Sequence, residues 1–270
     1  MNKPRIGMIG LGNIAQKAYL PTLTKEIDWT FVGAFTPNAE KRKQICKQYR
    51  IQDFSNLQTL ASECDAIFVH SSTATHYEIV SELLQKGIDV YVDKPLAATV
   101  EQAEKLVELS EKHNRKLMVG FNRRFVPMYV AAKEQANDIS WIRVVHNMIQ
   151  TNEKNELFYG HHTYTSTNGT LLSTAMHRHA GTNLEQIELV TTGKIIRVKN
   201  MNLLEIEQDN RITQSGSPSW ETTLKQRGFE DAVQHFIDCV QGDTKPLVDG
   251  VEGLKSQQML ESLLQSIEKK

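Results

Sequence analysis

The first half of the chain alternates short apolar runs with longer amphipathic stretches. The runs are rich in β-branched and aromatic residues, as buried strands are, and the stretches repeat apolar residues at spacings of three and four, as helices packed on a sheet do. The pattern therefore predicts a parallel sheet with crossover helices. The expected strands are Arg5–Ile9, Thr30–Phe35, Ala66–His70, Asp89–Val92 and Lys116–Gly120, and the expected helices are Ile14–Leu20, Ala39–Tyr49, Thr75–Gln85 and Val100–Lys112.

The second half carries longer β-type runs, which are joined by tight-turn signals such as Asn168-Gly169 and Thr192-Gly193. A predicted helix over Phe125–Asn137 precedes these runs, and a polar loop near Gln214–Pro218 follows them. This pattern predicts an antiparallel sheet and then two helices. The expected strands are Trp141–Gln150, Glu156–Ser166, Thr170–His179, Glu185–Thr191, Lys194–Lys199 and Leu203–Gln208, and the final helices are Phe229–Val240 and Val251–Ile267.

Together the two halves predict an α/β protein, with a doubly wound parallel sheet followed by an α+β domain on a mostly antiparallel open sheet. We expect the boundary near Phe121–Phe125, which gives domains of residues 1–122 and 123–270, with the last helices able to pack back on the first domain. A chain of 270 residues with 40% apolar residues is large enough for two such cores.

Charge and targeting features narrow the class of partner. The net charge of -1 comes from interspersed acids and bases, which gives no reason to expect nucleic acid or an anionic membrane and favours a small-molecule ligand. No apolar run approaches a membrane span and no leader pattern precedes the first strand, so we expect a cytoplasmic protein. The three cysteines are distant from one another and odd in number, so we expect them reduced rather than paired.

The turn after the first predicted strand reads Gly10-Leu11-Gly12-Asn13-Ile14-Ala15, a G-x-G-x-x-A pattern between a strand and a helix. Gly10 permits the tight turn, Gly12 lets the backbone approach a pyrophosphate, and Ala15 is small enough for close packing. The helix amino end, with Asn13 and Ile14, stabilises phosphate charge. The sequence thus predicts a dinucleotide loop, the alternative being a tight turn that binds nothing.

The second predicted strand ends in Phe35-Thr36-Pro37-Asn38, with no carboxylate where NAD-preferring sites usually hold the ribose hydroxyls. Lys41 lies one turn beyond, with Arg42 and Lys43 beside it. We therefore expect Thr36, Asn38 and Lys41 to line the adenosine ribose and NADP to be preferred slightly over NAD. The alternative is that these bases form the solvated face of a helix.

Two further loops follow strands whose carboxyl ends should meet the same sheet edge. After His70 comes a cluster of small hydroxyl residues, and Ser71, Ser72 and Thr73 are expected to donate to cofactor oxygens unless they only cap the next helix. After Val92 comes Asp93-Lys94-Pro95, in which the proline would fix the turn, with a cis peptide bond as one possibility. Lys94 can hold a substrate oxygen and accept its proton, or it is only a surface charge.

These motifs resemble the glucose-fructose oxidoreductase, inositol dehydrogenase and MocA family of NAD(P)-dependent oxidoreductases, over nearly the whole chain. The resemblance rests on Gly10–Ala15, on Asp93-Lys94-Pro95 and on Val119-Gly120-Phe121-Asn122-Arg123-Arg124-Phe125. Further stretches resemble its MviM-type branch, namely Val69–His76, Met176–Gly181 and Gln226–Phe229. The resemblance implies an N-terminal Rossmann domain and an α+β domain whose open sheet forms a homo-oligomer, a dimer or a tetramer.

The resemblance also implies roles for single residues. Lys94 would be the catalytic or substrate-orienting lysine, and Asn122 and Arg123 would line the nicotinamide and substrate pocket. His76 and Asp93 would lie near the cofactor. The implied reaction moves a hydride between nicotinamide and a hydroxyl-bearing carbon of a sugar, a cyclitol or a similar metabolite. The rival hypotheses are a non-catalytic NADP(H) sensor and a scaffold without cofactor.

One family feature is missing near residue 147, where relatives carry a helix that supplies a His or Asp for proton transfer. Roughly 40 residues are absent, about one helix with its connections. Either this chain has lost these residues by deletion, or the sequence leaves out a segment that the protein contains and numbers the flanking residues consecutively. We favour the second explanation, because losing a helix that covers the sheet would expose apolar surface. Nearby imidazoles lack metal-ligand spacing, so we predict strand or interface histidines and no metal site. These are His161, His162, His177 and His179.

Overall fold

The computed structural model describes residues 3–148, 159–242 and 244–268. The chain divides into two compact units. Unit 1 comprises Met1–Asn122 and Phe229–Lys270, and unit 2 comprises Arg123–Gly228. The expected boundary at residue 122 lies at the same place, but the contacts group the residues from Phe229 onward with unit 1 rather than with the second domain.

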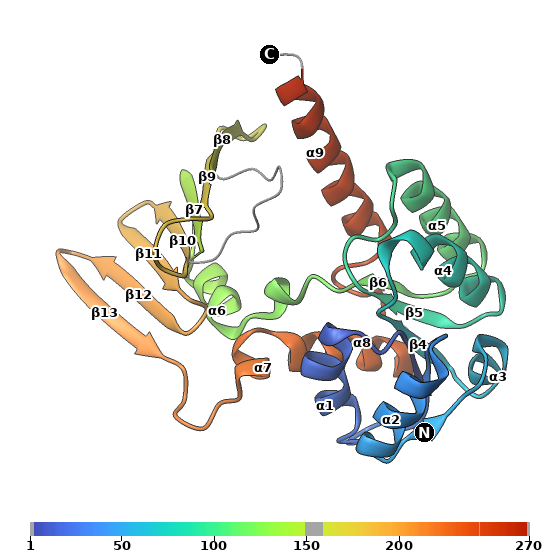
Figure 1. The fold of residues 1–270 in the computed structure, drawn as a ribbon. Helices are drawn as coiled ribbons and strands as arrows, with labels where there is room; N and C mark the ends of the chain where they lie inside the picture. The colour runs from blue at the N-terminus through green and yellow to red at the C-terminus, as the bar shows by residue number, and fades with distance from the viewer. Residues whose placement is uncertain (1–2, 149–158, 243, 269–270) are drawn as a thin grey trace. The chain divides into compact units, whose positions relative to one another are not determined.

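Unit 1 is built on a six-stranded sheet in the order β3-β2-β1-β4-β5-β6, in which every pair is parallel. Figure 1 labels β4, β5 and β6 of this sheet and the helices α4 and α5 near them. The strands are β1 (Arg5–Ile9), β2 (Thr30–Phe35), β3 (Gln52–Asp53), β4 (Ala66–Val69), β5 (Asp89–Val92) and β6 (Leu117–Val119). The helical segments are η1 (Ala15–Tyr19), α1 (Leu20–Leu23), α2 (Ala39–Tyr49), α3 (Leu57–Ser62), η2 (Thr73–Thr75), α4 (His76–Gln85), α5 (Val100–Lys112), η3 (Asn122–Phe125), α8 (Phe229–Gln241) and α9 (Gly250–Glu268), with η3 crossing the unit boundary. The doubly wound α/β prediction is confirmed.

Burial explains why α8 belongs to unit 1. Its apolar side chains Val233, Phe236 and Ile237 are fully buried, and the Phe236 ring packs edge-on against Phe68 of β4 at 5.4 Å between centroids. Burying each of these side chains contributes roughly 1.5–3 kcal/mol, which a helix exposed to water would forgo. The apolar stripe of α8 therefore completes the core of unit 1.

Unit 2 is built on a seven-stranded sheet in the order β13-β12-β11-β10-β7-β9-β8. All pairs are antiparallel except β7 with β9, which is parallel, so the prediction of a mostly antiparallel sheet is confirmed. The strands are β7 (Trp141–Asn147), β8 (Tyr159–Thr165), β9 (Leu171–His177), β10 (Leu184–Thr191), β11 (Lys194–Lys199), β12 (Leu203–Gln208) and β13 (Arg211–Gly216), and the helices are α6 (Pro127–Gln135) and α7 (Thr223–Gln226).

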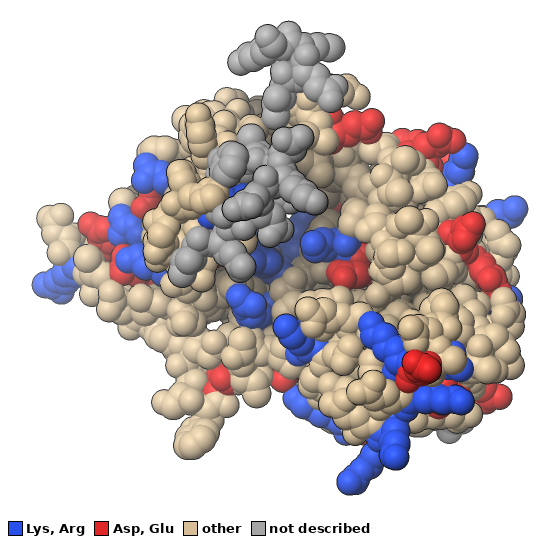
Figure 2. All heavy atoms as spheres, in the orientation of Figure 1, with Lys and Arg blue, Asp and Glu red and all other residues tan. Residues whose placement is uncertain are grey.

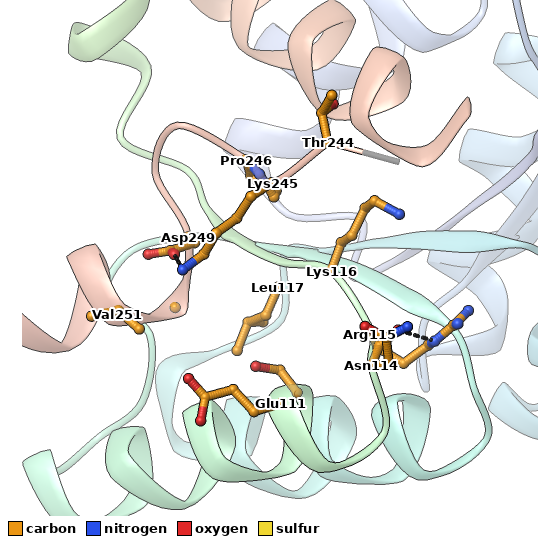
Figure 3. Close-up of a pocket in the computed structure, with 12 residues that line it drawn as sticks. Glu111, Asn114, Arg115, Lys116, Leu117, Thr244, Lys245, Pro246, Asp249 and Val251 are labelled. Carbon is orange, nitrogen blue, oxygen red and sulfur yellow. Dashed lines mark hydrogen bonds and ion pairs between the residues drawn. The ribbon is translucent and has the colours of Figure 1, made fainter. Parts of the chain in front are cut away.

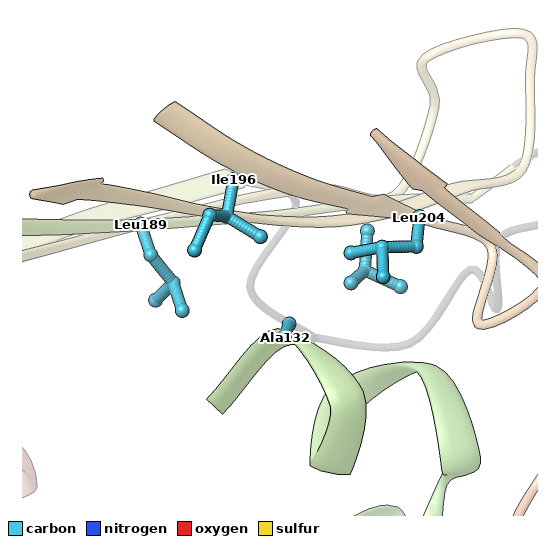
Figure 4. Close-up of a cluster of buried hydrophobic side chains, with 5 residues drawn as sticks. Ala132, Leu189, Ile196 and Leu204 are labelled. Carbon is cyan, nitrogen blue, oxygen red and sulfur yellow. The ribbon is translucent and has the colours of Figure 1, made fainter. Parts of the chain in front are cut away.

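Helix α6 covers one face of this sheet. Ala132 of α6 lies below Leu189, Ile196 and Leu204, which come from three neighbouring strands (Figure 4). The alternation along β11, in which Ile196 and Val198 are buried, orients these apolar side chains toward the helix. This cluster is the core of unit 2.

Part of unit 2 differs from expectation. Strand β13 takes up much of the segment expected as a polar loop, and it joins β12 through Asp209 and Asn210, both with positive φ (51° and 58°), as a two-residue hairpin requires. Strand β7 ends at Asn147, and the omission of residues near this position stays a prediction. The expected strand ends at 149–150 and 156–158 lie outside the described residues.

The described residues bear on two further features, membrane-spanning helices and the state of the cysteines. None of the described helices is long and apolar enough to cross a membrane. Cys46, Cys64 and Cys239 are all buried free thiols, and burial raises the pKa of Cys46 to about 11. A buried thiol with a raised pKa carries little thiolate at neutral pH, so these cysteines serve as packing residues.

Candidate functional site

The glycine-rich loop has the backbone that a phosphate loop needs. Gly10 has a φ of +90°, and a Cβ added there would lie 2.4 Å from the carbonyl carbon of His70, so no larger residue fits. The nearest atom to a Cβ added at Gly12 is 4.0 Å away, which leaves open space over the turn. Ala15 is fully buried, whereas Asn13 and Ile14 are exposed. The loop therefore fits a pyrophosphate at its outer face.

The strand ends bring the expected loops to one edge of the sheet. A backbone hydrogen bond joins each strand end to its neighbour: Gly10 N–H donates to Phe35 O (2.9 Å), His70 N–H to Ile9 O (2.7 Å), Asp93 N–H to Val69 O (2.9 Å) and Gly120 N–H to Val92 O (2.8 Å). The residues that follow β1, β2, β4, β5 and β6 thus line the carboxyl edge. Ligands of open α/β sheets bind at this edge.

At the end of β2, the basic cluster is smaller than its sequence suggests. Arg42 is buried, forms an ion pair with Asp53 and donates from Nη1 to the Thr36 carbonyl oxygen at 2.9 Å. Asn38 caps α2, because its Oδ1 accepts from the Lys41 amide at 2.9 Å. Arg42 therefore has a structural role in fixing Thr36, and the side chains of Lys41 and Lys43 remain exposed.

After β4, the hydroxyl residues bond to one another. Thr75 donates from Oγ1 to Ser71 Oγ at 2.9 Å, and Ser72 precedes η2 without a side-chain capping bond. The capping alternative is therefore not observed at Ser72, and its side chain is exposed at the edge with Thr73 half-buried beside it. His76 is 1% exposed, and both of its ring nitrogens face backbone carbonyl oxygens, so it is enclosed by protein.

After β5, the turn places Lys94 at the surface of the edge. Lys94 is exposed, its backbone N–H donates to Asp93 Oδ1 at 2.8 Å, and the Lys94–Pro95 peptide bond is cis, as the sequence allowed. His70, which sequence reasoning did not assign, is fully buried with Nδ1 4.0 Å from Asp93 Oδ2. Burial lowers the pKa of His70, so its ring is neutral.

Burial and neighbouring groups have opposite effects on the pKa of Asp93. Burial alone would raise it, but the interactions with His70 and with the Lys94 amide outweigh burial and hold the pKa of the Asp93 carboxyl below its usual value. Asp93 is therefore a carboxylate at neutral pH. It fixes the backbone amide of the residue that carries the exposed ammonium group.

In unit 2, Arg123 forms a cluster that the sequence did not reveal. Its Nε and Nη2 donate to the two carboxylate oxygens of Glu185 at 2.7 and 2.6 Å, and the Tyr129 hydroxyl donates to Glu185 Oε1 at 2.8 Å. Although burial opposes it, these donors lower the pKa of Glu185. Arg123, Glu185 and His146 line a cavity of about 440 Å³. Asn122 begins η3 as the last residue of the first segment of unit 1.

The Glu185→Gln variant is expected to destabilise unit 2 by roughly 2 kcal/mol at neutral pH, because a carboxylate with two guanidinium bonds loses its charge while Arg123, half exposed, regains only water. The lowered pKa of Glu185 means that its contribution is present above the ordinary carboxyl pKa and is lost as the pH falls through the lowered value. Urea denaturation of both proteins at neutral and acidic pH measures this difference.

Glu134→Gln serves as the matched control, because Glu134 is exposed on α6. It should unfold at the wild-type urea concentration at both pH values. Equal stability of wild type and Glu185→Gln at neutral pH would show that the Arg123 pair contributes nothing.

A second cavity, of about 350 Å³, lies in unit 1 between the end of α5 and the segment that leads into α9 (Figure 3). Three of its basic residues form ion pairs within the protein: Lys245 with Asp249, and Arg115 and Lys116 with Asp89. No predicted site residue lines it.

Lys and Arg side chains stand beside Asp and Glu side chains on the face drawn in Figure 2. The described residues hold no cluster of three potential metal ligands.

Comparison with known families agrees with this geometry. Residues 4–121 match the model of an oxidoreductase family with an NAD-binding Rossmann fold, and residues 143–209 match a YceM-like C-terminal domain. The "Putative oxidoreductase YceM" of Salmonella typhimurium is 39% identical over 97% of this chain and 98% of its own length. The crystal structure of the dehydrogenase MviM from Clostridium difficile has a TM-score of 0.91 and 45% identity, covering 98% of this chain and 100% of its own.

A more distant relative adds a named substrate. The inositol 2-dehydrogenase of Paracoccus denitrificans is 34% identical over 146 residues, which are 50% of this chain and 42% of its own. The alignment to YceM spans 301 positions, whereas 97% of the 270 residues here is about 262, so about 39 aligned positions have no counterpart in this chain. The alignment length does not place these positions along the chain, so a loss near residue 147 stays a prediction.

Proposed function

We propose that this chain, which belongs to the Gfo/Idh/MocA family of NAD(P)-dependent oxidoreductases, moves a hydride between nicotinamide and a hydroxyl-bearing carbon of a small polar metabolite. The observation that carries the proposal is the alignment of Gly10, His70, Asp93 and Gly120 along one sheet edge, where a backbone hydrogen bond links each of them to a neighbouring strand. A sugar or a cyclitol is the substrate class favoured by the similarity to an inositol dehydrogenase.

The loops at this edge of the sheet would hold the cofactor. Gly10 to Ala15 would bind the pyrophosphate through backbone amides, with Gly12 leaving the space that the phosphates need. The hydroxyl groups of Ser71, Ser72 and Thr73 would donate hydrogen bonds to the adenosine diphosphate half of the cofactor. Thr36 and Asn38 would flank the adenosine ribose. When bound, the nicotinamide supplies the hydride acceptor or donor.

Lys94 would act on the substrate oxygen. Its ammonium group is exposed at the edge, while its backbone amide is fixed by Asp93. An ammonium group at this position can donate to a hydroxyl or carbonyl oxygen, and as an amine it can accept the hydroxyl proton as the hydride leaves the adjacent carbon. Asn122 and Arg123 would contribute to substrate recognition.

We infer a preference for NADP over NAD, supported by the absence of a carboxylate after β2 and by the exposure of Lys41. Fluorescence titration with NADPH and NADH tests it. NADPH should bind more tightly, and Lys41→Ala should weaken NADPH about tenfold while leaving NADH unchanged, because one charge-assisted phosphate contact is lost. Lys47→Ala, at the exposed far end of α2, is the control. Tenfold tighter NADH binding would reverse the assignment.

A non-catalytic sensor of NADP(H) is the second candidate, favoured by the absence of about 39 positions relative to YceM. Both candidates bind the cofactor, so binding alone does not separate them. Hydride transfer does: a panel of sugars and cyclitols with NADP yields NADPH only from the enzyme. A homo-oligomer formed through the sheet of unit 2 stays a prediction.

A further inference from the structure

A single buried imidazole joins the two loops beside Lys94. His76 is the first residue of α4, and its Nδ1 lies 2.9 Å from the carbonyl oxygen of Pro95 while its Nε2 lies 3.2 Å from that of Ser71. Ser71 follows β4, and Pro95 follows Lys94 in the turn after β5. The ring therefore spans two neighbouring loops of the carboxyl edge and has 1% of its surface exposed.

The two partners define what this ring can do. A backbone carbonyl oxygen only accepts hydrogen bonds, so a bond to either oxygen uses an N–H of the ring as its donor. Because the ring is enclosed by protein, no water replaces such a bond when it is lost, and its loss costs free energy.

We propose that His76 ties the Ser71 loop to the turn of Lys94 through the Ser71 and Pro95 carbonyl oxygens, and that it positions Lys94 rather than contacting the cofactor. The positioning role rests on the proposed function of Lys94, whereas the tie itself does not. The sequence resemblance implied a place near the cofactor for His76; the two carbonyl contacts explain that place without any direct contact.

The tie is not the only contact that holds this turn. The Lys94 amide donates to Asp93, and the Ala97 amide donates to Gln257. Loss of the imidazole should therefore loosen the turn without unfolding it, so turnover should fall while cofactor affinity stays unchanged.

Hydrogen exchange tests the positioning of the turn. In His76→Leu, the amides of Lys94 and Ala97 should exchange about tenfold faster than in wild type, since the tie that holds the turn is lost. His76→Gln, which keeps a donor, should lie between them, and His113→Gln, beyond the end of α5, should match wild type. Wild-type exchange in both His76 variants would overturn the role, and His76→Gln gives this reading if His76→Leu fails to fold.

Failure of the proposed function has a different signature. If Lys94→Ala retained full turnover, Lys94 would have no catalytic role, while the exchange rates of the His76 variants would still report the tie. If Lys94→Ala lost turnover and His76→Leu exchanged faster without any loss of turnover, the tie would exist but would not position Lys94.

Discussion

Gly10→Ala should lower the melting temperature by roughly 6–12 °C and abolish measurable NADPH binding. The positive φ of +90° costs a residue with a Cβ about 1–3 kcal/mol, and the added carbon would overlap the backbone of His70 and Ser71 at 2.4–2.6 Å. Neither neighbour can yield, because His70 N–H is bonded to β1. Thermal unfolding and nicotinamide fluorescence measure the two effects.

Two other glycines separate the causes. Gly12→Ala meets no atom closer than 4.0 Å, so it should melt as wild type but bind NADPH at least tenfold more weakly, because its Cβ occupies the space for the phosphates. Gly87→Ala has a φ of +77° and nothing within 4 Å, so it should lose only about 1 kcal/mol of stability and keep its affinity. Wild-type affinity in Gly12→Ala would argue against a cofactor at this loop.

Lys94→Ala should lower turnover at least tenfold and leave cofactor affinity nearly unchanged. The ammonium group is exposed and its removal leaves no cavity, while the loss of a proton-transferring group typically costs about 10²–10⁴-fold in rate. The assay follows NADPH formation from whichever sugar or cyclitol the wild type oxidises. Lys86→Ala removes an exposed lysine paired with Glu82 and should not alter turnover. Full turnover in Lys94→Ala would remove Lys94 from the mechanism.

Unit 1 was largely predictable from local pattern. The bounds of β1, β2, β5, α2 and α5 are those that the sequence indicated, because a buried parallel strand is a continuous apolar run and a covering helix carries a clear apolar stripe. The loops after β1, β4 and β5 could then be assigned to one edge by the geometry of parallel sheets alone. The family resemblance, the fold class and the oxidoreductase class are confirmed by the comparisons.

Features that depend on contacts between distant residues were not predictable. Strand β13 is exposed along its whole length, so it lacks an apolar alternation, and only the Asp209-Asn210 turn could have signalled its hairpin. The parallel pairing of β7 with β9 has no local signature. Arg123 and Glu185 are 62 residues apart in the chain, and nothing in either segment identifies the partner.

The role of histidines shows the same limit within the candidate site. His70 and His76 flank a hydroxyl-rich loop, and both are buried. Their contacts separate them, since His70 packs against the Tyr19 ring at 3.9 Å between centroids, whereas the ring nitrogens of His76 face two carbonyl oxygens. Such assignments require the positions of Tyr19 and Pro95, which the local sequence does not give.

The central claim is that the loop Gly10–Ala15 and Lys94 hold the two ends of one dinucleotide. A crystal structure of the intact protein with NADP tests it most directly. We predict the pyrophosphate on the backbone amides of Gly12 and Asn13 and the nicotinamide ring beside Lys94. A dinucleotide bound away from this edge, such as in the cavity beside Arg115 and Lys245, would contradict the account.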